Sequence, residues 1–222
     1  LDSPDFIRKI PIPYNPTSLQ NINFVLISHD HIDHCDPLTL PLIYENNPNV
    51  KFVGPYSVRQ KLMIWGINEE NVINPRNEFF SLGKDLEVRS VIAAHPKFEI
   101  ANDGFSSHIG YLLKFGNLCI YSAGDTCIFD ELIDELKDLP RVDIAILPVN
   151  EDNFFRRKRG IIGNMSIREA FGLADLLNFK NVIPVHWDMF EFNSTLPEEI
   201  KSVYRGYKWN FKLFMDFAEL LR

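Results

Sequence analysis

Three of the six histidines in this chain fall within a single hexapeptide, His29-Asp30-His31-Ile32-Asp33-His34. Imidazole and carboxylate groups are good ligands for zinc, manganese or iron, so this spacing is typical of a metal site. An H-x-H-x-D-H string is also far more specific than a lone histidine, which makes a polar surface loop the weaker interpretation. The chain must therefore fold so that this loop is held rigidly and further ligands reach it.

The hexapeptide follows the apolar run Phe24-Val25-Leu26-Ile27. This run predicts a short buried strand that ends at Ser28, with the histidines on the loop after it. Such a loop can curl so that His29 and His31 face one cation while Asp33 and His34 face a second. Two neighbouring cations can activate a shared water molecule.

Three further candidate ligands also stand after strand-like runs. His95 follows residues 91–94, Asp125 follows residues 119–124, and His186 follows residues 182–185. Functional groups gathered at strand ends from distant parts of a sequence are typical of a rigid scaffold that carries catalytic loops. Together with the hexapeptide, these three residues predict a complete two-metal site.

These motifs resemble the metallo-β-lactamase superfamily, and within it the L-ascorbate-6-phosphate lactonase group. The superfamily resemblance covers nearly the whole chain and is very specific, whereas the features of the lactonase group are only moderately so. The superfamily motifs are His29-x-His31-x-Asp33-His34, His95, Ser122-Ala123-Gly124-Asp125-Thr126 and Pro184-Val185-His186-Trp187. The supporting segments are Phe52-Val53-Gly54-Pro55, Trp65-Gly66, Arg159-Gly160-Ile161 and Met165-Ser166.

The resemblance implies a ligand set for two divalent ions, zinc or manganese. His29, His31 and His95 would hold the first ion, Asp33, His34 and His186 the second, and Asp125 would bridge them. The lactonases carry a carboxylate near the position of His95, so the histidine here favours zinc over manganese. Superfamily enzymes that use iron to reduce oxygen usually have Glu in place of the second histidine, which argues against that chemistry.

His108 offers a competing assignment for the first site. It stands before the apolar segment Ile109-Gly110-Tyr111-Leu112-Leu113. We favour His95, because a ligand at the end of a strand matches the superfamily pattern and His108 stands at the start of one. His108 then contacts substrate or caps the strand.

The length and composition agree with a single α/β domain over residues 1–222, since 45% hydrophobic residues suffice for a substantial core. Helices are predicted over residues 37–46, 55–65 and 166–177, the last with a capping box. The resemblance implies an αβ/βα sandwich of two facing mixed sheets with outer helices. The superfamily usually has two or three strands before the metal loop, so we expect these strands to be missing or the domain to be shortened.

The net charge of −7 argues against a nucleic-acid partner. The exception is the run Arg156-Arg157-Lys158-Arg159, expected in a loop. It either balances nearby acidic residues or binds a phosphate on a small substrate, for which Arg159 is the favoured residue. No run approaches the ~18 apolar residues that would span a membrane.

The three cysteines, Cys35, Cys119 and Cys127, cannot all pair, which suits a reducing cytoplasm. Cys119 is expected in the core. Cys35 and Cys127 lie close to ligands in the sequence and are either inert or oxidation-sensitive. A homo-oligomer is compatible with the sequence.

The predicted function is hydrolysis of a small lactone, with a phosphorylated sugar lactone such as L-ascorbate 6-phosphate as substrate. Asp33 would orient a metal-activated water and take its proton, while Asp125 would hold both ions. A metal-dependent phosphodiesterase is the alternative. A non-catalytic metal-binding or assembly subunit is the second alternative.

Overall fold

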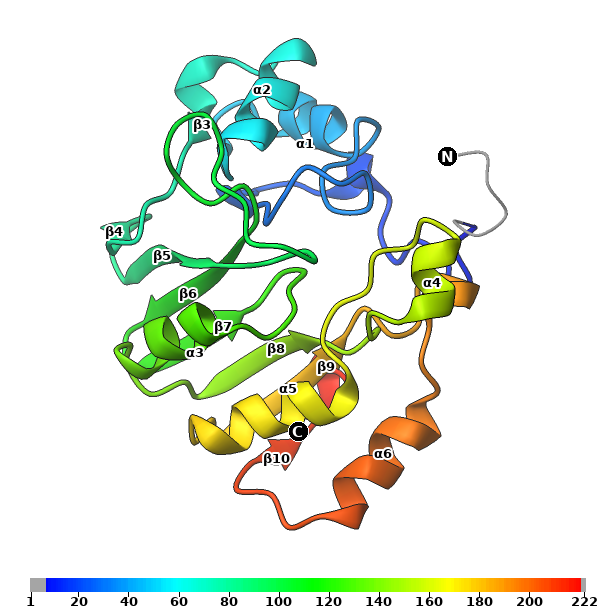
Figure 1. Ribbon diagram of the computed structural model, residues 1–222. Coiled ribbons are helices and arrows are strands. Elements are labelled where there is room, and N and C mark those ends of the chain that lie inside the picture. The colour runs from blue at the N-terminus through cyan, green and yellow to red at the C-terminus, as the bar shows by residue number, and fades with distance from the viewer. Residues whose placement is uncertain (1–6, 221–222) are drawn as a thin grey trace.

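The computed structural model describes residues 7–220 and has two β-sheets packed face to face, with helices outside both (Figure 1). The small sheet has the order β1-β2-β3, and the large sheet has the order β10-β9-β8-β7-β6-β5-β4. The strands of the small sheet are β1 (Phe24–Leu26), β2 (Lys51–Val53) and β3 (Val72–Ile73). Those of the large sheet are β4 (Phe80–Ser81), β5 (Leu86–Ile92), β6 (Ile109–Phe115), β7 (Leu118–Ser122), β8 (Ile144–Pro148), β9 (Asn181–Val185) and β10 (Lys212–Leu213).

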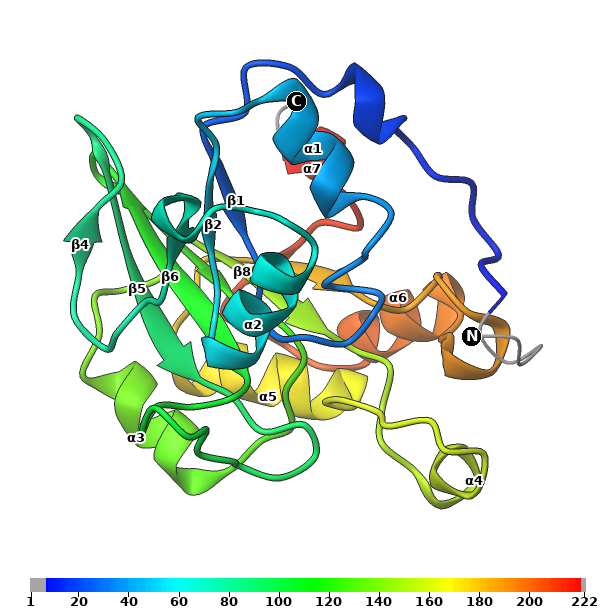
Figure 2. The same ribbon diagram turned by 90° about the horizontal axis from the view of Figure 1, so that it is seen from above.

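Two groups of helices cover the outer faces of the sheets (Figures 1 and 2). The group on the small sheet is α1 (Leu40–Asn46) and α2 (Tyr56–Ile64). The large sheet is covered by α3 (Asp130–Lys137), α5 (Ile167–Leu176) and α6 (Pro197–Gly206). The short helices α4 (Phe154–Lys158) and α7 (Phe217–Leu220) complete the set, with 3₁₀ turns at Pro16–Ser18, Glu69–Asn71 and Glu191–Asn193.

The small sheet is wholly parallel, whereas two mixed sheets were expected. The reason is its connectivity, because α1 links β1 to β2 and α2 leads from β2 toward β3. A helix that crosses over between neighbouring strands returns the chain in the same direction. The order of the layers is otherwise the predicted one.

The large sheet is mixed, and its strand directions position the site. Strands β4 to β7 pair antiparallel, and β7 to β10 pair parallel. The carboxyl ends of β5, β7, β8 and β9 therefore meet at one edge. Strand β6 runs the other way, so its first residue lies at that same edge.

Apolar side chains fill each interface between layers. Phe52 and Leu62 belong to the core between the small sheet and its helices, and Phe171 belongs to the core between the large sheet and its helices. Between the sheets, the buried Tyr111 hydroxyl lies 2.8 Å from the carbonyl oxygens of both Ile27 and Val53. This hydroxyl ties the two sheets together next to the metal loop.

Two of the predicted helices are confirmed, and one begins later than predicted. Helix α5 carries the expected capping box between Ser166 and Glu169, and α2 ends just before Gly66, whose φ is +83°. The helix predicted over residues 37–46 begins only at Leu40. Residues before it form a turn because the Asp36 carboxylate accepts hydrogen bonds from the backbone N–H of Leu38 and from a threonine hydroxyl.

The described residues ahead of β1 form no strand other than an isolated bridge between Arg8 and Phe190. Strand β1 is an edge strand of the small sheet in this structure. Within residues 7–220, no helix combines the length and the apolar character that crossing a membrane requires.

Candidate metal centre

The seven predicted ligands come together at the edge of the large sheet where β5, β7 and β9 end. The hexapeptide follows β1 and faces this edge from the small sheet. The backbone N–H of Ile109 donates to the carbonyl of Ser28 over 3.0 Å, which joins the start of β6 to the metal loop. Both sheets thus contribute to one site.

Asp125 lies at the centre of the cluster and is buried. Its Oδ1 atom is 3.4 Å from Nε2 of His34, and its Oδ2 atom is 3.5 Å from Nε2 of His95 and 3.4 Å from Nε2 of His186. Two donor atoms bound tetrahedrally to one zinc ion at about 2.0 to 2.2 Å are themselves about 3.4 Å apart. The separations around Asp125 are therefore those of ligands that share a metal ion.

The second predicted group is compact. The Oδ2 atom of Asp33 is 3.3 Å from Nε2 of His186 and 3.7 Å from Nε2 of His34. One ligand atom from each of these residues lies within 4.8 Å of the other two. This trio is the set that the resemblance implied for the second ion.

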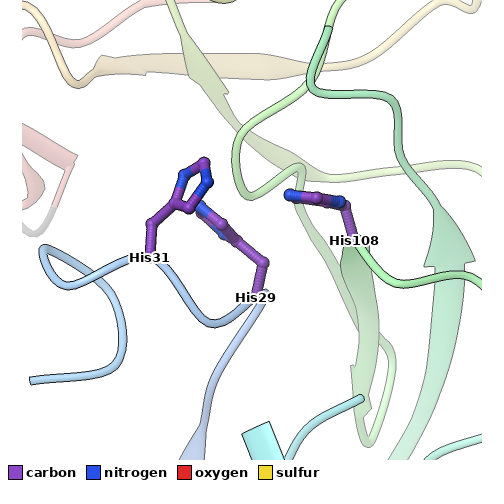
Figure 3. A group of neighbouring side chains, drawn as sticks. All are labelled: His29, His31 and His108. Carbon is purple, nitrogen blue, oxygen red and sulfur yellow. The ribbon is translucent and has the colours of Figure 1, made fainter. Parts of the chain in front are cut away.

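On the side of the first predicted group, the compact set of ligand nitrogens includes His108 and not His95. Ligand nitrogens of His29, His31 and His108 lie within 4.8 Å of one another (Figure 3). His95 stands close by, with its ring centroid 5.2 Å from that of His31. The two competing candidates, His95 and His108, are thus both at the site.

Several buried imidazole nitrogens at the centre have no hydrogen-bond partner among the described residues. These atoms are Nε2 of His29, Nε2 of His34, Nδ1 of His95, Nε2 of His108, and both ring nitrogens of His186. A buried polar atom without a partner costs about 1 to 3 kcal/mol, and such atoms are rare. Bound divalent ions would satisfy the nitrogens that face the cluster, so these residues fit the metal ions that the sequence predicts.

The protonation states on the first side suit metal binding. Burial lowers the pKa of His29 far below its usual value, and neighbouring histidines add to the effect. Burial also lowers the pKa of His95 to about 4, although the Asp125 carboxylate opposes this. Both imidazoles are therefore neutral at pH 7, as ligands must be.

At the second site, charge interactions between carboxylates and imidazoles determine the pKa values. Burial opposes ionisation of Asp125, but His186, His34 and His95 outweigh it and hold its pKa well below the usual value. Burial likewise opposes a charge on His186, yet Asp125 and Asp33 raise its pKa to about 9. Without metal, the proton on His186 takes the place of a cation between these carboxylates.

Backbone conformation at the centre is constrained in two places. Gly124 has a φ of +63°, and a Cβ atom there would lie 2.7 Å from Cβ of Ser28 and 2.8 Å from the carbonyl oxygen of Ile109. His186 has a φ of +62°, which is uncommon for residues other than glycine, although asparagine, aspartate and histidine adopt it more often than the rest. Strained backbone of this kind gathers at functional sites.

A cavity of about 240 Å³ opens onto the ligands. Its walls are largely apolar, and its floor carries metal-ligand candidates. The lining residues are His31, Ile32, Asp33, His95, Asp125, Gly160, Ile161, Ile162, His186, Phe190 and Asn193. The site can therefore hold a small molecule with one polar group directed at the cluster.

Asn193 lines the cavity with an amide side chain. Its Oδ1 atom accepts a hydrogen bond from Nδ2 of Asn150 over 3.1 Å. Asn150 in turn accepts from Nδ2 of Asn164 over 2.9 Å, and all three side chains are buried. This chain of amides fixes the orientation of Asn193. The sequence analysis did not identify Asn193, because no local pattern distinguishes these asparagines before the fold brings them together.

The basic run predicted in a loop lies instead on α4 and at its end. Asn153 caps this helix by accepting from the backbone N–H of Arg156, which stabilises a helical turn over the run. The Arg156 guanidinium donates to three backbone carbonyls, and Arg157 pairs with Asp152. Both arginines thus have structural partners.

Arg159 is exposed, and its guanidinium carbon lies 4.0 Å from the centroid of the Phe192 ring. It does not line the cavity, although the next three residues do. Phe190 walls the cavity, whereas Trp187 packs against the large core. The cavity wall therefore begins at the Gly160 segment that follows Arg159.

The cysteines show no sign of reactivity. Cys119 is a buried core residue, as predicted. Burial raises the pKa of the Cys35 thiol and of the Cys127 thiol to about 11 in each case. Thiols with such pKa values are protonated at neutral pH and are weak nucleophiles.

Comparison with known proteins agrees with the fold. Residues 3–187 match the model of the beta-lactamase superfamily domain. The UPF0173 metal-dependent hydrolase of Pyrobaculum islandicum is 31% identical over 199 residues, covering 86% of this chain and 78% of that protein. A protein of Salmonella heidelberg named probable L-ascorbate-6-phosphate lactonase UlaG is 26% identical over 94% of this chain, which spans only 62% of its length.

Solved structures share the fold. The metallo hydrolase Igni18 of Ignicoccus hospitalis has a TM-score of 0.65 at 21% identity, covering 87% of this chain and 76% of its own. An isothiocyanate hydrolase from Delia radicum gut bacteria has a TM-score of 0.68 at 15% identity, covering 90% and 77% respectively. The chain belongs to the beta-lactamase superfamily, and it is a metal-dependent hydrolase of that fold.

Proposed function

We propose that this hydrolase opens a small lactone with water at a two-metal centre. The single observation that carries the proposal is the Asp125 carboxylate, which lies at ligand spacing from histidines of both groups, beside a cavity of about 240 Å³. The likeness to the proteins named as lactonases supports the reaction class. An ester carbonyl in a ring is the electrophile that suits such a site.

The ligand set is the one that the sequence predicts. His29, His31 and His95 would hold one ion, and Asp33, His34 and His186 would hold the other. Asp125 lies between the two groups. Bound divalent ions lower the pKa of a water ligand from about 15.7 toward about 7 and polarise the carbonyl that it attacks. Zinc and manganese both suit this donor set.

Asp33 acts as the general base. Its carboxylate lines the cavity, and the nearby His186 and His34 imidazoles hold its pKa below the usual value despite burial. An ionised carboxylate beside the attacking water orients it and accepts its proton. The proton then passes to the alkoxide that leaves when the ring opens, so no separate leaving group departs.

The cavity walls hold the ring of the substrate. Ile161, Ile162 and Phe190 give an apolar surface, and the Asn193 amide faces an oxygen of the lactone. A phosphorylated sugar lactone such as L-ascorbate 6-phosphate would in addition place its phosphate at Arg159, beyond the cavity mouth.

The homo-oligomer and the cytoplasmic location remain expectations from the sequence.

The test compares a sugar-phosphate lactone, an unphosphorylated lactone and a phosphodiester on protein loaded with zinc or manganese. Lactone turnover is the expected result, and cleavage of the phosphodiester alone would replace the proposal by that alternative. R159Q should raise KM for the phosphorylated lactone without changing kcat. The control is R157Q, because Arg157 carries the same charge in the same basic run but lies two residues farther from the Gly160 segment that lines the cavity. Equal behaviour of the two variants would remove Arg159 from the substrate site.

A further inference from the structure

Four histidine rings lie close together at the first metal site. They are His29, His31, His95 and His108, and their six pairwise centroid distances run from 4.6 to 5.7 Å. Four imidazoles bound to one tetrahedral ion at about 2.0 to 2.1 Å would have ring centroids about 5 Å apart. This ring spacing has room for one ion among them, and ligand nitrogens of His29, His31 and His108 also lie within 4.8 Å of one another.

We propose that His108 is a ligand of the first metal ion, together with His29, His31 and His95. His108 is 8% exposed, its Nε2 atom has no hydrogen-bond partner among the described residues, and this ring points toward those of His29 and His31 (Figure 3). His29 is fully buried, and its Nε2 atom is likewise without a partner. Buried nitrogens that converge without partners require a cation or water among them.

A hydrogen-bond chain fixes the tautomer of His108. The Ser107 hydroxyl donates its one hydrogen to the carbonyl of Glu99 over 3.1 Å, so it can only accept from Nδ1 of His108, which lies 3.3 Å away. The proton of the neutral ring is therefore on Nδ1. The lone pair is left on Nε2, the atom that faces the other histidines. Metal-binding histidines are usually held in this way.

Strand direction brings His108 to the first metal site. It directly precedes β6, which runs antiparallel to β5 and β7 and so begins at the edge where they end. The His108 carbonyl also accepts from the backbone N–H of Ala93 over 3.2 Å. The segments before β6 and after β5 are thereby held side by side, each with one histidine at the site.

The proposal makes the two metal sites chemically different. The first receives four neutral nitrogens, whereas the second receives two imidazoles and the Asp33 carboxylate, with Asp125 between them. A site filled by protein ligands is typical of structural zinc, and an open position is typical of catalytic zinc. The first ion would then be the more tightly held. This inference rests on the metal centre of the proposed function but not on its substrate.

The test measures zinc binding without any substrate. Metal-free wild type, H108Q and H95Q are titrated with zinc against a chromophoric chelator, and zinc per chain is measured by elemental analysis. H108Q and H95Q should each weaken the same one of two binding steps by at least about tenfold. H186Q should weaken the other step. K97Q, which changes an exposed side chain in the same loop, is the matched control.

Unchanged zinc binding in H108Q would overturn the proposal. If H108Q raised KM and left zinc binding unchanged, His108 would instead contact substrate. Folding is checked by the circular dichroism and unfolding temperature of the metal-free variants. If H108Q does not fold, S107A provides the second test, because it keeps the ring and removes its hydrogen-bond partner. S107A should weaken the same step by about 10-fold or more, and unchanged binding would again refute the role of His108. If the variants weaken zinc binding as expected but the protein hydrolyses no lactone, only the substrate assignment fails.

Discussion

The carboxylate of Asp33 and the imidazole of His186 meet with 3.3 Å between Oδ2 and Nε2, although the two residues are far apart in the sequence. If Asp33 is the general base, D33N should lower kcat for lactone hydrolysis by about 10²- to 10⁴-fold. D30N is the control, because Asp30 belongs to the same hexapeptide but pairs with Lys61 over 2.9 Å. Near-wild-type turnover in D33N, or an equal loss in D30N, would contradict this role.

Asn193 should affect substrate binding and leave the metal ions in place. N193A removes the amide that Asn150 orients, so KM for a lactone should rise by about 10-fold, the value of one hydrogen bond of about 1.4 kcal/mol. Zinc content should equal that of wild type. Steady-state kinetics and elemental analysis on the same preparation check both points. A loss of metal would show that Asn193 supports the centre instead.

Gly124 should tolerate alanine less well than Gly116 does. Both have positive φ, +63° and +57°, but a Cβ at Gly124 would meet Ser28 at 2.7 Å, whereas at Gly116 nothing lies within 4 Å. G116A should therefore cost only the left-handed backbone strain of about 1 to 2 kcal/mol. G124A should cost more in denaturant unfolding and should weaken zinc binding. Equal losses in the two variants would mean that close packing at Gly124 is unimportant.

Metal removal should lower thermal stability, because ions that bind only the folded chain stabilise it. At a free zinc concentration of about 100 times Kd, the gain is about 2.7 kcal/mol, or roughly 5 to 10 °C in Tm for a chain of this size. Calorimetry with and without a chelator measures the difference. The converging nitrogens of the centre predict a rise on zinc addition, and an unchanged Tm would argue that the sites stay empty.

Local sequence alone determined much of this protein. The hexapeptide, the apolar runs before His95, Asp125 and His186, and the Ser166 capping box are short-range patterns whose physical meaning does not depend on distant residues. They predicted residues that the structure does bring together, and the resemblance that they carry implied the superfamily fold. The late start of α1 and the helical turn at Arg156 were missed, because each depends on how one side chain bonds to nearby backbone.

Only the tertiary structure decided how the ligands are shared and what surrounds them. His108 seemed the weaker candidate because it begins a strand, yet the antiparallel direction of β6 brings that beginning to the edge where β5 ends. The amides of Asn150 and Asn193 likewise meet only when β8 and β9 lie side by side. Strand direction and pairing join residues that are far apart in sequence, and no local pattern records which ends will meet.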